Sequence, residues 1–360
     1  YGSRTMWIDN KIIRQDLEYA LSNSAIPWTS LNNATILVTG ATGLIGQTII
    51  NTLLYYSLKN NAPLRILALA RDKQKVQQKF DQQIKTFNQL KFIYGDICNL
   101  PSINEHIEYI IHAAGETNSH AFVDKPIETI HTILQGTENL LKIALEEKVK
   151  GFVFLSSMEV YGAPKNTQPL AEDAGTTIDP MSVRSSYPES KRMAEALCAA
   201  YFSEHGVPAK VVRLAQTFGP GIEPTDTRVF AEFVRSALEN KDIVLKTKGT
   251  SRRMYVYTIE AVTAILLVLL KGENGHAYNV ANPATYCSIV EMAQLICDKL
   301  NNKIAIQFLD HPDGVEKYSP EHYLNLDIHK IEALGWHPTI GLYEMYRRTI
   351  ESLSNNKQQH

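Results

Sequence analysis

The 360-residue chain has little of what marks several specialised protein classes. Its few cysteines show no paired metal-site or disulfide spacing, which indicates a reducing cytoplasm and no metal site; they are Cys98, Cys198, Cys287 and Cys297. The most apolar run, 261–270, is too short to cross a bilayer, and no secretory signal is visible. A net charge of −2 argues against nucleic-acid or membrane binding by bulk electrostatics. We therefore expect a cytoplasmic globular protein.

The strongest signal that is present is a glycine-rich turn between an expected strand and an expected helix. Residues 35–39 form a short apolar, β-branched run, and a helical pattern begins at Leu44. Gly40, Gly43 and Gly46 occupy the turn and the first helical residues, with the spacing of a dinucleotide phosphate loop. Phosphates would lie at the helix N-terminus, where free N–H groups favour negative charge. The competing interpretation is a βα turn that binds nothing.

The next expected strand, 65–70, bears on the choice of dinucleotide. It ends in Arg71 and Asp72. An acidic side chain at this place holds the ribose 2′-hydroxyl of NAD, whereas an arginine suits the 2′-phosphate of NADP. Arg71 therefore favours NADP slightly and Asp72 leaves NAD open, unless both are ordinary solvated charges at a strand end.

A second signal is a tyrosine and a lysine four residues apart in a helical pattern. Tyr187 and Lys191 would stand on one helix face. A tyrosine base near neutral pH needs its pKa lowered by about 3 units from about 10, or about 4 kcal/mol, and a nearby ammonium acts in that direction. Ser156 and Ser157 follow the apolar run 151–155, expected as a central strand whose carboxyl end faces the cofactor. Beside a dinucleotide loop, this set predicts a hydride-transfer site.

Another expected strand, 109–111, ends in a histidine and small residues. Ala113, Ala114 and Gly115 would let a cofactor lie close to the chain. We interpret His112, which precedes them, as a packed structural histidine rather than a catalyst.

With these residues in view, the chain resembles the extended short-chain dehydrogenases/reductases, specifically their NAD(P)-dependent nucleotide-sugar epimerase/dehydratase branch, over roughly residues 34–340. UDP-glucuronate decarboxylases are also similar. The segments that carry the resemblance are 39–46, 95–97, 112–115, 156–162, 187–191, 213–220, 226–229, 249–257 and 334–338.

The resemblance implies an α/β fold, a Rossmann-type doubly wound parallel sheet with a smaller C-terminal substrate-binding lobe. It implies that Tyr187 is the base and that Lys191 binds the nicotinamide ribose, while Ser157 binds the same sugar oxygen as Tyr187. The implied cofactor contacts are Gly40, Thr42, Gly43, Leu44, Ile45, Gly46, Arg71, Asp96, Ile97, Ala113, Ala114, Gly115, Ser156 and Lys191. Arg228 and Arg253 would contact the nucleotide and diphosphate, unless they are surface arginines, and Gln216 stands where asparagine is common.

Departures from the branch bear on the reaction. Dehydratases carry an aspartate where this chain has Met158, and methionine cannot donate a proton for water loss. Glu159 remains a candidate acid/base, and Ile133 replaces a frequent asparagine near the cofactor. We expect an epimerase acting on a nucleoside-diphosphate sugar, through transient oxidation at C4 with NAD or NADP. Alternatives are a UDP-glucuronate decarboxylase-like or 4,6-dehydratase activity, an NADPH-dependent reductase, and a non-catalytic dinucleotide sensor.

The expected organisation has four parts. Residues 1–33 form an N-terminal extension, whose first five residues are interpreted as foreign and whose helix packs on the sheet domain or a second subunit. Residues 34–217 form the dinucleotide-binding domain, and 218–350 form mainly the substrate lobe. A polar tail covers 351–360, and its residues 354–360 are expected to be disordered. We expect a homodimer.

Overall fold

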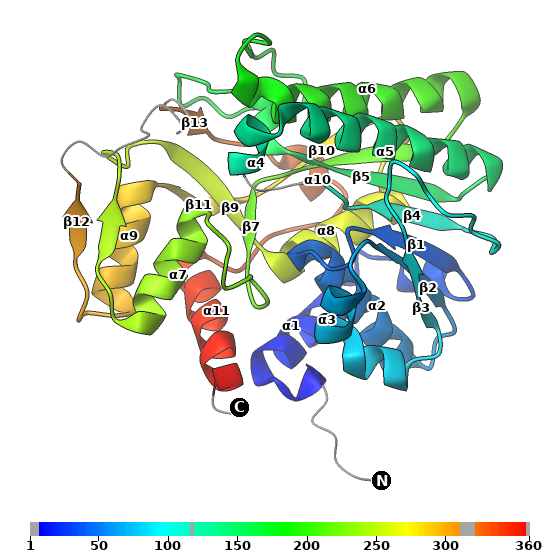
Figure 1. The fold of residues 1–360 in the computed structure, drawn as a ribbon, viewed down its shortest axis with the longest axis horizontal. Helices are drawn as coiled ribbons and strands as arrows, with labels where there is room; N and C mark the ends of the chain where they lie inside the picture. Colours follow the sequence, from blue (N-terminus) through cyan, green and yellow to red (C-terminus); the bar gives the residue numbers. More distant parts are fainter. Residues whose placement is uncertain (1–6, 116–118, 310–320, 358–360) are drawn as a thin grey trace.

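The computed structural model describes residues 7–115, 119–309 and 321–357, so the five residues interpreted as foreign lie outside it (Figure 1). Its main sheet has seven strands, all parallel, in the order β10-β6-β5-β4-β1-β2-β3. They are β1 Thr35–Thr39, β2 Arg65–Ala70, β3 Leu90–Tyr94, β4 Tyr109–His112, β5 Gly151–Ser157, β6 Ala209–Leu214 and β10 Ala277–Val280. The predicted α/β class with a doubly wound parallel sheet is confirmed.

Helices cover both faces of this sheet. Successive side chains of β1 point to opposite faces, so Ile36 and Val38 join one buried cluster and Leu37 joins another. In Figure 1, α5 and α6 lie along one face, and α2 and α8 lie across the other. The bounds are α2 Leu44–Asn60, α3 Lys73–Thr86, α4 Ser119–Asp124, α5 Pro126–Glu146, α6 Ser186–His205 and α8 Thr258–Lys271.

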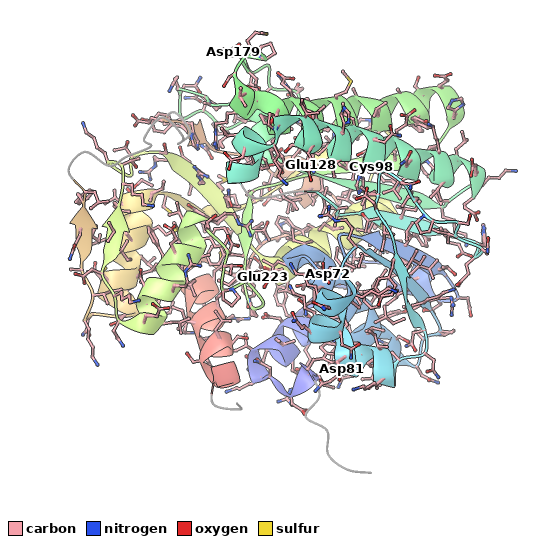
Figure 2. The ribbon with its side chains drawn as sticks, viewed as in Figure 1. Asp72, Asp81, Cys98, Glu128, Asp179 and Glu223 are labelled. Carbon is pink, nitrogen blue, oxygen red and sulfur yellow. The ribbon has the colours of Figure 1, made fainter. Side chains whose placement is uncertain are left out.

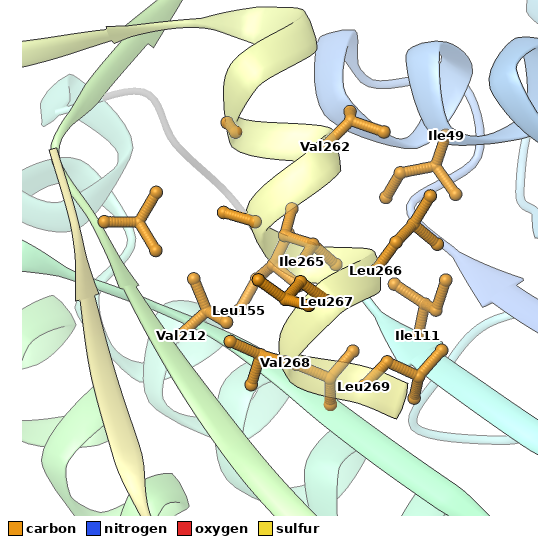
Figure 3. Packing of buried hydrophobic residues seen from close by; sticks show 14 of the residues in the cluster. Ile49, Ile111, Leu155, Val212, Val262, Ile265, Leu266, Leu267, Val268 and Leu269 are labelled. Carbon is orange, nitrogen blue, oxygen red and sulfur yellow. The ribbon is translucent and has the colours of Figure 1, made fainter. Parts of the chain in front are cut away.

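The chain returns to the main sheet late, through α8 and β10. Val262, Ile265 and Leu266 of α8 pack between Ile49 of α2 and the strands β4, β5 and β6 (Figure 3). Strand β10 then adds to the sheet edge beside β6. Residues 258–280, which the sequence analysis placed in the mainly substrate-binding part, therefore contribute helix α8 and strand β10 to the part of the molecule built on the main sheet.

The smaller lobe is built around a second sheet, β11-β9-β13, with β7 also paired to β9. Its own apolar cluster brings together Phe218, Phe230 and Tyr255. The strands are β7 Gln216–Phe218, β8 Ile243–Leu245, β9 Arg252–Tyr257, β11 Asn282–Ser288, β12 Ile306–Phe308 and β13 Tyr323–Leu324. The helices are α7 Val229–Glu239, α9 Ile289–Lys299, α10 His329–Glu332 and α11 Leu342–Lys357, and short 3₁₀ turns cover Trp7–Asp9, Trp28–Leu31, Met158–Tyr161 and Val183–Ser185.

The N-terminal helix α1, Lys11–Leu21, packs against α2, α8 and α11. The buried Asp16 carboxylate accepts hydrogen bonds from Tyr257 at 2.5 Å and from Arg348 of α11 at 3.0 Å. Asn10 caps α1 and donates to Ser352 Oγ at 3.3 Å. This contact buries Ser352, and α11 continues to Lys357, so the expectation of a disordered tail from residue 354 is wrong up to Lys357. The last three residues lie outside the described ones.

Candidate active site

The glycine loop follows β1 and is compressed against the end of β4. Gly40 has φ +65°, and a Cβ atom on it would come within 2.5 Å of the Ala113 carbonyl oxygen. A Cβ atom on Gly46 would come within 2.1 Å of the Gly40 carbonyl oxygen. Side chains at these two positions would displace backbone, so only glycine lets the chain turn here. Helix α2 begins directly after the loop, at Leu44, and its first-turn N–H groups have no acceptors within the helix.

The end of β4 is held by a buried network centred on His112. Its Nδ1 and Nε2 atoms lie 3.0 Å from the hydroxyl groups of Thr39 and Thr137. Thr39 also accepts a hydrogen bond from the Ala114 N–H at 3.1 Å. Burial lowers the pKa of His112 to about 3, and the charge of Lys191 acts in the same direction. His112 is therefore a neutral packed side chain that fixes residues 113–115, as predicted.

Tyr187 and Lys191 lie one turn apart on α6, and both are buried. The Lys191 ammonium donates to the Leu155 carbonyl at 2.7 Å and stands 5.7 Å from the centre of the Tyr187 ring. A Cβ atom on Gly115 would come within 3.7 Å of Lys191 Nζ. The ends of β4 and β5 and the start of α6 thus meet at this amine. Burial lowers the pKa of Lys191 to about 8.

The ring of Phe122, from α4, stacks on the Tyr187 ring with centroids 4.1 Å apart and planes 9° apart. Ser186, the residue before Tyr187, donates to the Phe122 carbonyl at 2.9 Å. This contact fixes the plane of the phenol, and the sequence analysis missed it. No spacing signal links the two aromatic residues, because they come from helices separated by β5.

Polar residues follow β5, as predicted for a strand that ends at the cofactor. Ser157 Oγ accepts from the Glu159 N–H at 3.1 Å and so begins a 3₁₀ turn. The buried Ser156 hydroxyl has no hydrogen-bond partner among the described residues. Met158 is 1 % exposed and belongs to the apolar core, whereas Glu159 is partly exposed.

These features test whether the residues fit a dinucleotide. The crowded Gly40 and Gly46 positions form a cradle that admits no side chain, and the orphaned Ser156 hydroxyl calls for a polar partner from outside the chain. Lys191 supplies a buried cation at the same strand ends. The glycine loop, Ser156 and Lys191 therefore fit a ligand that carries phosphate and hydroxyl groups, as a dinucleotide does.

Three of the expected cofactor contacts, Arg71, Asp96 and Ile97, lie just after the ends of β2 and β3. Arg71 is mostly exposed, and its Nη1 lies 3.9 Å from a carboxylate oxygen of Asp96. Asp96 also accepts from the Cys98 N–H at 2.7 Å. Asp72 instead caps α3, accepting from the Gln74 N–H at 2.8 Å. The Asp72 carboxylate therefore serves the helix, which leaves Arg71 as the more available side chain.

The loop after β3, which carries Ile97, packs closely against α5. A Cβ atom on Gly136 of α5 would lie 2.8 Å from the Ile97 side chain, and Asn139 donates to the Ile97 carbonyl at 2.9 Å. Ile133 is buried in the same apolar cluster. Asn139 thus supplies a polar contact to this loop from a position six residues, or nearly two helical turns, beyond Ile133.

The predicted substrate-binding side chains lie in the smaller lobe or at its base. Gln216 begins β7 and pairs in register with Tyr255 of β9. Arg228 forms an ion pair with Asp226 at 2.6 Å, and Arg253 lies 2.9 Å from the His322 ring. The Arg253 Nε atom is buried without a hydrogen-bond partner among the described residues. Contacts from these residues to a nucleotide remain predictions.

A cavity of about 730 Å³ lies elsewhere, between α6, β6 and α10. Its lining includes Arg213 and Glu195, which pair with each other at 2.8 Å. Neither Tyr187 nor Lys191 lines it. Because its buried charges are already matched, we do not assign the substrate to this cavity.

Two further searches cover the described residues alone. No helix in ranges 7–115, 119–309 and 321–357 combines the length and apolarity needed to span a bilayer. In the same ranges no three His, Cys, Asp or Glu side chains are grouped as metal ligands.

Comparison with known proteins decides the family. The model of the NAD dependent epimerase/dehydratase family matches residues 36–281, which include the glycine loop and the Tyr187–Lys191 pair. The chain belongs to this family. UDP-glucuronic acid decarboxylase 3 of Arabidopsis thaliana is 29% identical over 87% of this chain and 86% of its own length.

Two solved structures of other family enzymes share the fold. The dTDP-glucose 4,6-dehydratase DesIV of Streptomyces venezuelae, with NAD bound, has a TM-score of 0.75 at 23% identity and covers 90% of this chain and 98% of its own. The UDP-N-acetylglucosamine 4-epimerase of Methanobrevibacter ruminantium has a TM-score of 0.77 at 21% identity, covering 90% and 99%. The predicted resemblance to this epimerase/dehydratase family is confirmed.

Proposed function

We propose that this family member acts on a nucleoside-diphosphate sugar through transient oxidation of the sugar at C4. The observation that carries the proposal is the buried Tyr187–Lys191 pair at the strand ends that meet the glycine loop. Burying an amine costs stability, so the position of Lys191 beside the phenol is better explained by chemistry than by packing.

The residues of the chain divide the chemistry between them. The glycine loop and Lys191 would hold NAD or NADP, which would supply the hydride chemistry of the reaction. Tyr187 takes the proton of the sugar hydroxyl, and Ser157 donates a hydrogen bond to the same oxygen. Lys191 stabilises the phenolate by its charge, because burial weakens solvent screening around it. The Leu155 carbonyl and the Phe122 ring keep the amine and the phenol in position.

The ketone formed at C4 allows several outcomes, and we propose inversion and return of the hydride as the first. The burial of Met158 in the apolar core supports this over water loss, because no acid stands at that position. A second candidate is loss of a C6 carboxylate as CO₂, supported by the similarity to a UDP-glucuronic acid decarboxylase over 87% of the chain. In that case Arg253, with its unpartnered buried Nε, is our candidate for the carboxylate contact.

We further propose NADP as the slightly preferred dinucleotide, because Asp72 is engaged as a helix cap and Arg71 is exposed. We also propose that the enzyme is a cytoplasmic homodimer. Sedimentation analysis of the purified chain would give its mass in solution and would contradict the dimer if it returned that of one chain.

The deciding experiment is incubation with a panel of UDP-, dTDP-, GDP- and CDP-sugars, without added cofactor, followed by mass and NMR analysis. Unchanged mass with inverted stereochemistry indicates an epimerase, a loss of about 18 mass units a dehydratase and of about 44 a decarboxylase, since these are water and carbon dioxide. In a parallel incubation with added NADPH, stoichiometric consumption of that NADPH indicates a reductase. Binding of a dinucleotide without any conversion, by wild type and Tyr187→Phe alike, would leave only the sensor and would refute the proposal.

A further inference from the structure

The loop between β7 and α7 joins the smaller lobe to the glycine loop. Gly221, with φ +93°, lies so that a Cβ atom on it would be 3.5 Å from the Leu44 side chain at the start of α2. Ile222, the next residue, is buried in the apolar cluster of the smaller lobe, and Leu44 packs against the same cluster. The loop is therefore held close to the helix N-terminus that the cofactor phosphates would occupy.

Glu223, the following residue, makes an ionic contact across the two parts of the molecule. Its carboxylate pairs with Lys79 of α3 and lies 3.4 Å from Lys75 Nζ on the same helix. Lys79 Nζ in turn donates to the carbonyl of Thr42, within the glycine loop, at 2.8 Å. Glu223 of the smaller lobe thus contacts Lys79, and Lys79 in turn contacts the glycine loop. Figure 2 shows Glu223 beside the start of α3, where Asp72 is labelled.

The loop that carries Glu223 is itself fixed. Arg235 of α7 donates to the Pro224 carbonyl at 3.2 Å and also to the Asp226 carbonyl. The Asp226 carboxylate accepts from the Arg228 N–H at 3.0 Å. Because these hydrogen bonds fix the loop to α7, Glu223 moves together with the smaller lobe.

The charges show that this contact is more than a solvated surface pair. The Lys79 side chain is only 15% exposed, and Glu223 is 40% exposed. Burial opposes ionisation of Glu223, but Lys79 and Lys75 outweigh it and lower the pKa of the carboxyl. A matched ion pair in the same lobe, Glu239 with Lys241 at 2.7 Å, has a similarly exposed carboxylate but joins neighbouring residues.

We infer that Glu223 is a positioning residue that retains the dinucleotide, by tying the smaller lobe through Lys79 to the glycine loop. An enzyme that returns its hydride must keep the same cofactor through the cycle, and a lobe pinned over the phosphate cradle slows release. The inference rests on the proposed function for its purpose, but only on dinucleotide binding for its test.

The experiment measures release of NADH from the full chain. Enzyme loaded with NADH is mixed with excess NAD, and the loss of protein-bound NADH fluorescence gives the dissociation rate. Glu223→Gln should release NADH about two- to fivefold faster, the range for a partly exposed ion pair. Glu239→Gln should release it at the wild-type rate. With saturating NAD the variant should keep its kcat, and without added NAD its activity should decline over successive turnovers.

A double-mutant cycle separates positioning from general loss of structure. Lys79→Gln and the double variant should release NADH at the rate of Glu223→Gln, because either change breaks the same link. Lys79→Arg, which keeps the charge, should restore slow release. Wild-type release by a folded Glu223→Gln protein, or equal acceleration by Glu239→Gln, would overturn the inference and leave the proposed function standing. Slow release by wild type without conversion of any sugar would contradict the proposed function and leave the inference standing.

Discussion

Replacing Lys191 by methionine is expected to abolish turnover while leaving the fold as stable as wild type or more stable. Methionine is unbranched and ends one heavy atom short of the lysine amine, which lies 4.6 Å from the centre of the Phe154 ring, so most of the apolar stem is kept while the buried charge is removed. This separates a residue kept for chemistry from one kept for packing, because a packing residue would cost stability when changed.

The magnitude follows from the buried amine. Its pKa falls from 10.5 to about 8 because of burial, and a difference of about 2.5 pH units corresponds to about 3 kcal/mol of lost stability at pH 7. Methionine avoids this loss of stability, because it carries no charge. It also leaves the Leu155 carbonyl without its hydrogen-bond donor, at a cost of about 1–3 kcal/mol. The net change is a stabilisation of about 0–2 kcal/mol.

The pH dependence has a definite sign. Below pH 8 the amine is charged in both the folded and unfolded states, and the cost of burying it is fully present. Between pH 8 and 10.5 the folded protein holds fewer protons than the unfolded chain, so the stability of wild type rises with pH. The advantage of Lys191→Met should therefore be largest at pH 7 and smaller at pH 9.

Urea unfolding at pH 7 and 9 measures both effects, and Lys210 provides the matched control. Lys210 is also buried on the sheet, donates to the Leu269 carbonyl at 3.2 Å and has its pKa lowered to about 8 by burial. Lys210→Met should show the same stability change with turnover intact. A loss of more than about 2 kcal/mol in Lys191→Met alone would refute the reasoning, because the amine would then be contributing to the fold.

Three further predictions concern the cofactor and the base. Gly46→Ala should weaken dinucleotide binding at least about tenfold, because overpacking costs about 1–3 kcal/mol. Gly43→Ala should weaken binding less, because a Cβ atom on Gly43 would lie 3.3 Å from its nearest neighbour. Both affinities are measured by fluorescence titration, and equal losses would contradict the crowding argument. Arg71→Gln should reduce affinity for NADP about tenfold, as for loss of a charged hydrogen bond, and leave affinity for NAD unchanged. Parallel titrations with the two dinucleotides measure this, and unchanged affinity for both would show that Arg71 is an ordinary surface arginine. Tyr187→Phe should lower turnover about 10²–10⁴-fold with dinucleotide affinity retained, and full activity in stopped assays would rule out the phenol as base.

Local patterns predicted the parts of the site that lie within one turn or one helix. The glycine spacing, the strand before it and the helix from Leu44 are all short-range features, and the structure has them at β1 and α2. Tyr187 and Lys191 are one helical turn apart, so their shared face follows from helix geometry alone. The role of His112 as packing followed from its place at the end of an apolar strand.

Contacts between distant segments could not be predicted in the same way. Phe122 meets Tyr187, and Glu223 meets Lys79, only after the sheet brings their elements together. The return of α8 and β10 to the main sheet was missed because a buried apolar helix fits either lobe by composition. The continuation of α11 to Lys357 was missed because the polar sequence of this segment does not show that Ser352 is buried against the distant helix α1.

The buried Met158 links the fold to the choice of reaction. It lies between Ser157, whose hydroxyl is our proposed partner of the sugar oxygen, and Glu159, whose N–H donates to that hydroxyl. An acid at this position would either bury a charge in the core cluster to which Met158 belongs, or leave that cluster and lose its apolar contacts. The turn is thus built to hold the hydroxyl still and to keep an acid out. Among the outcomes open to a 4-ketone, those that need no acid beside the serine, inversion and decarboxylation, suit this turn better than loss of water.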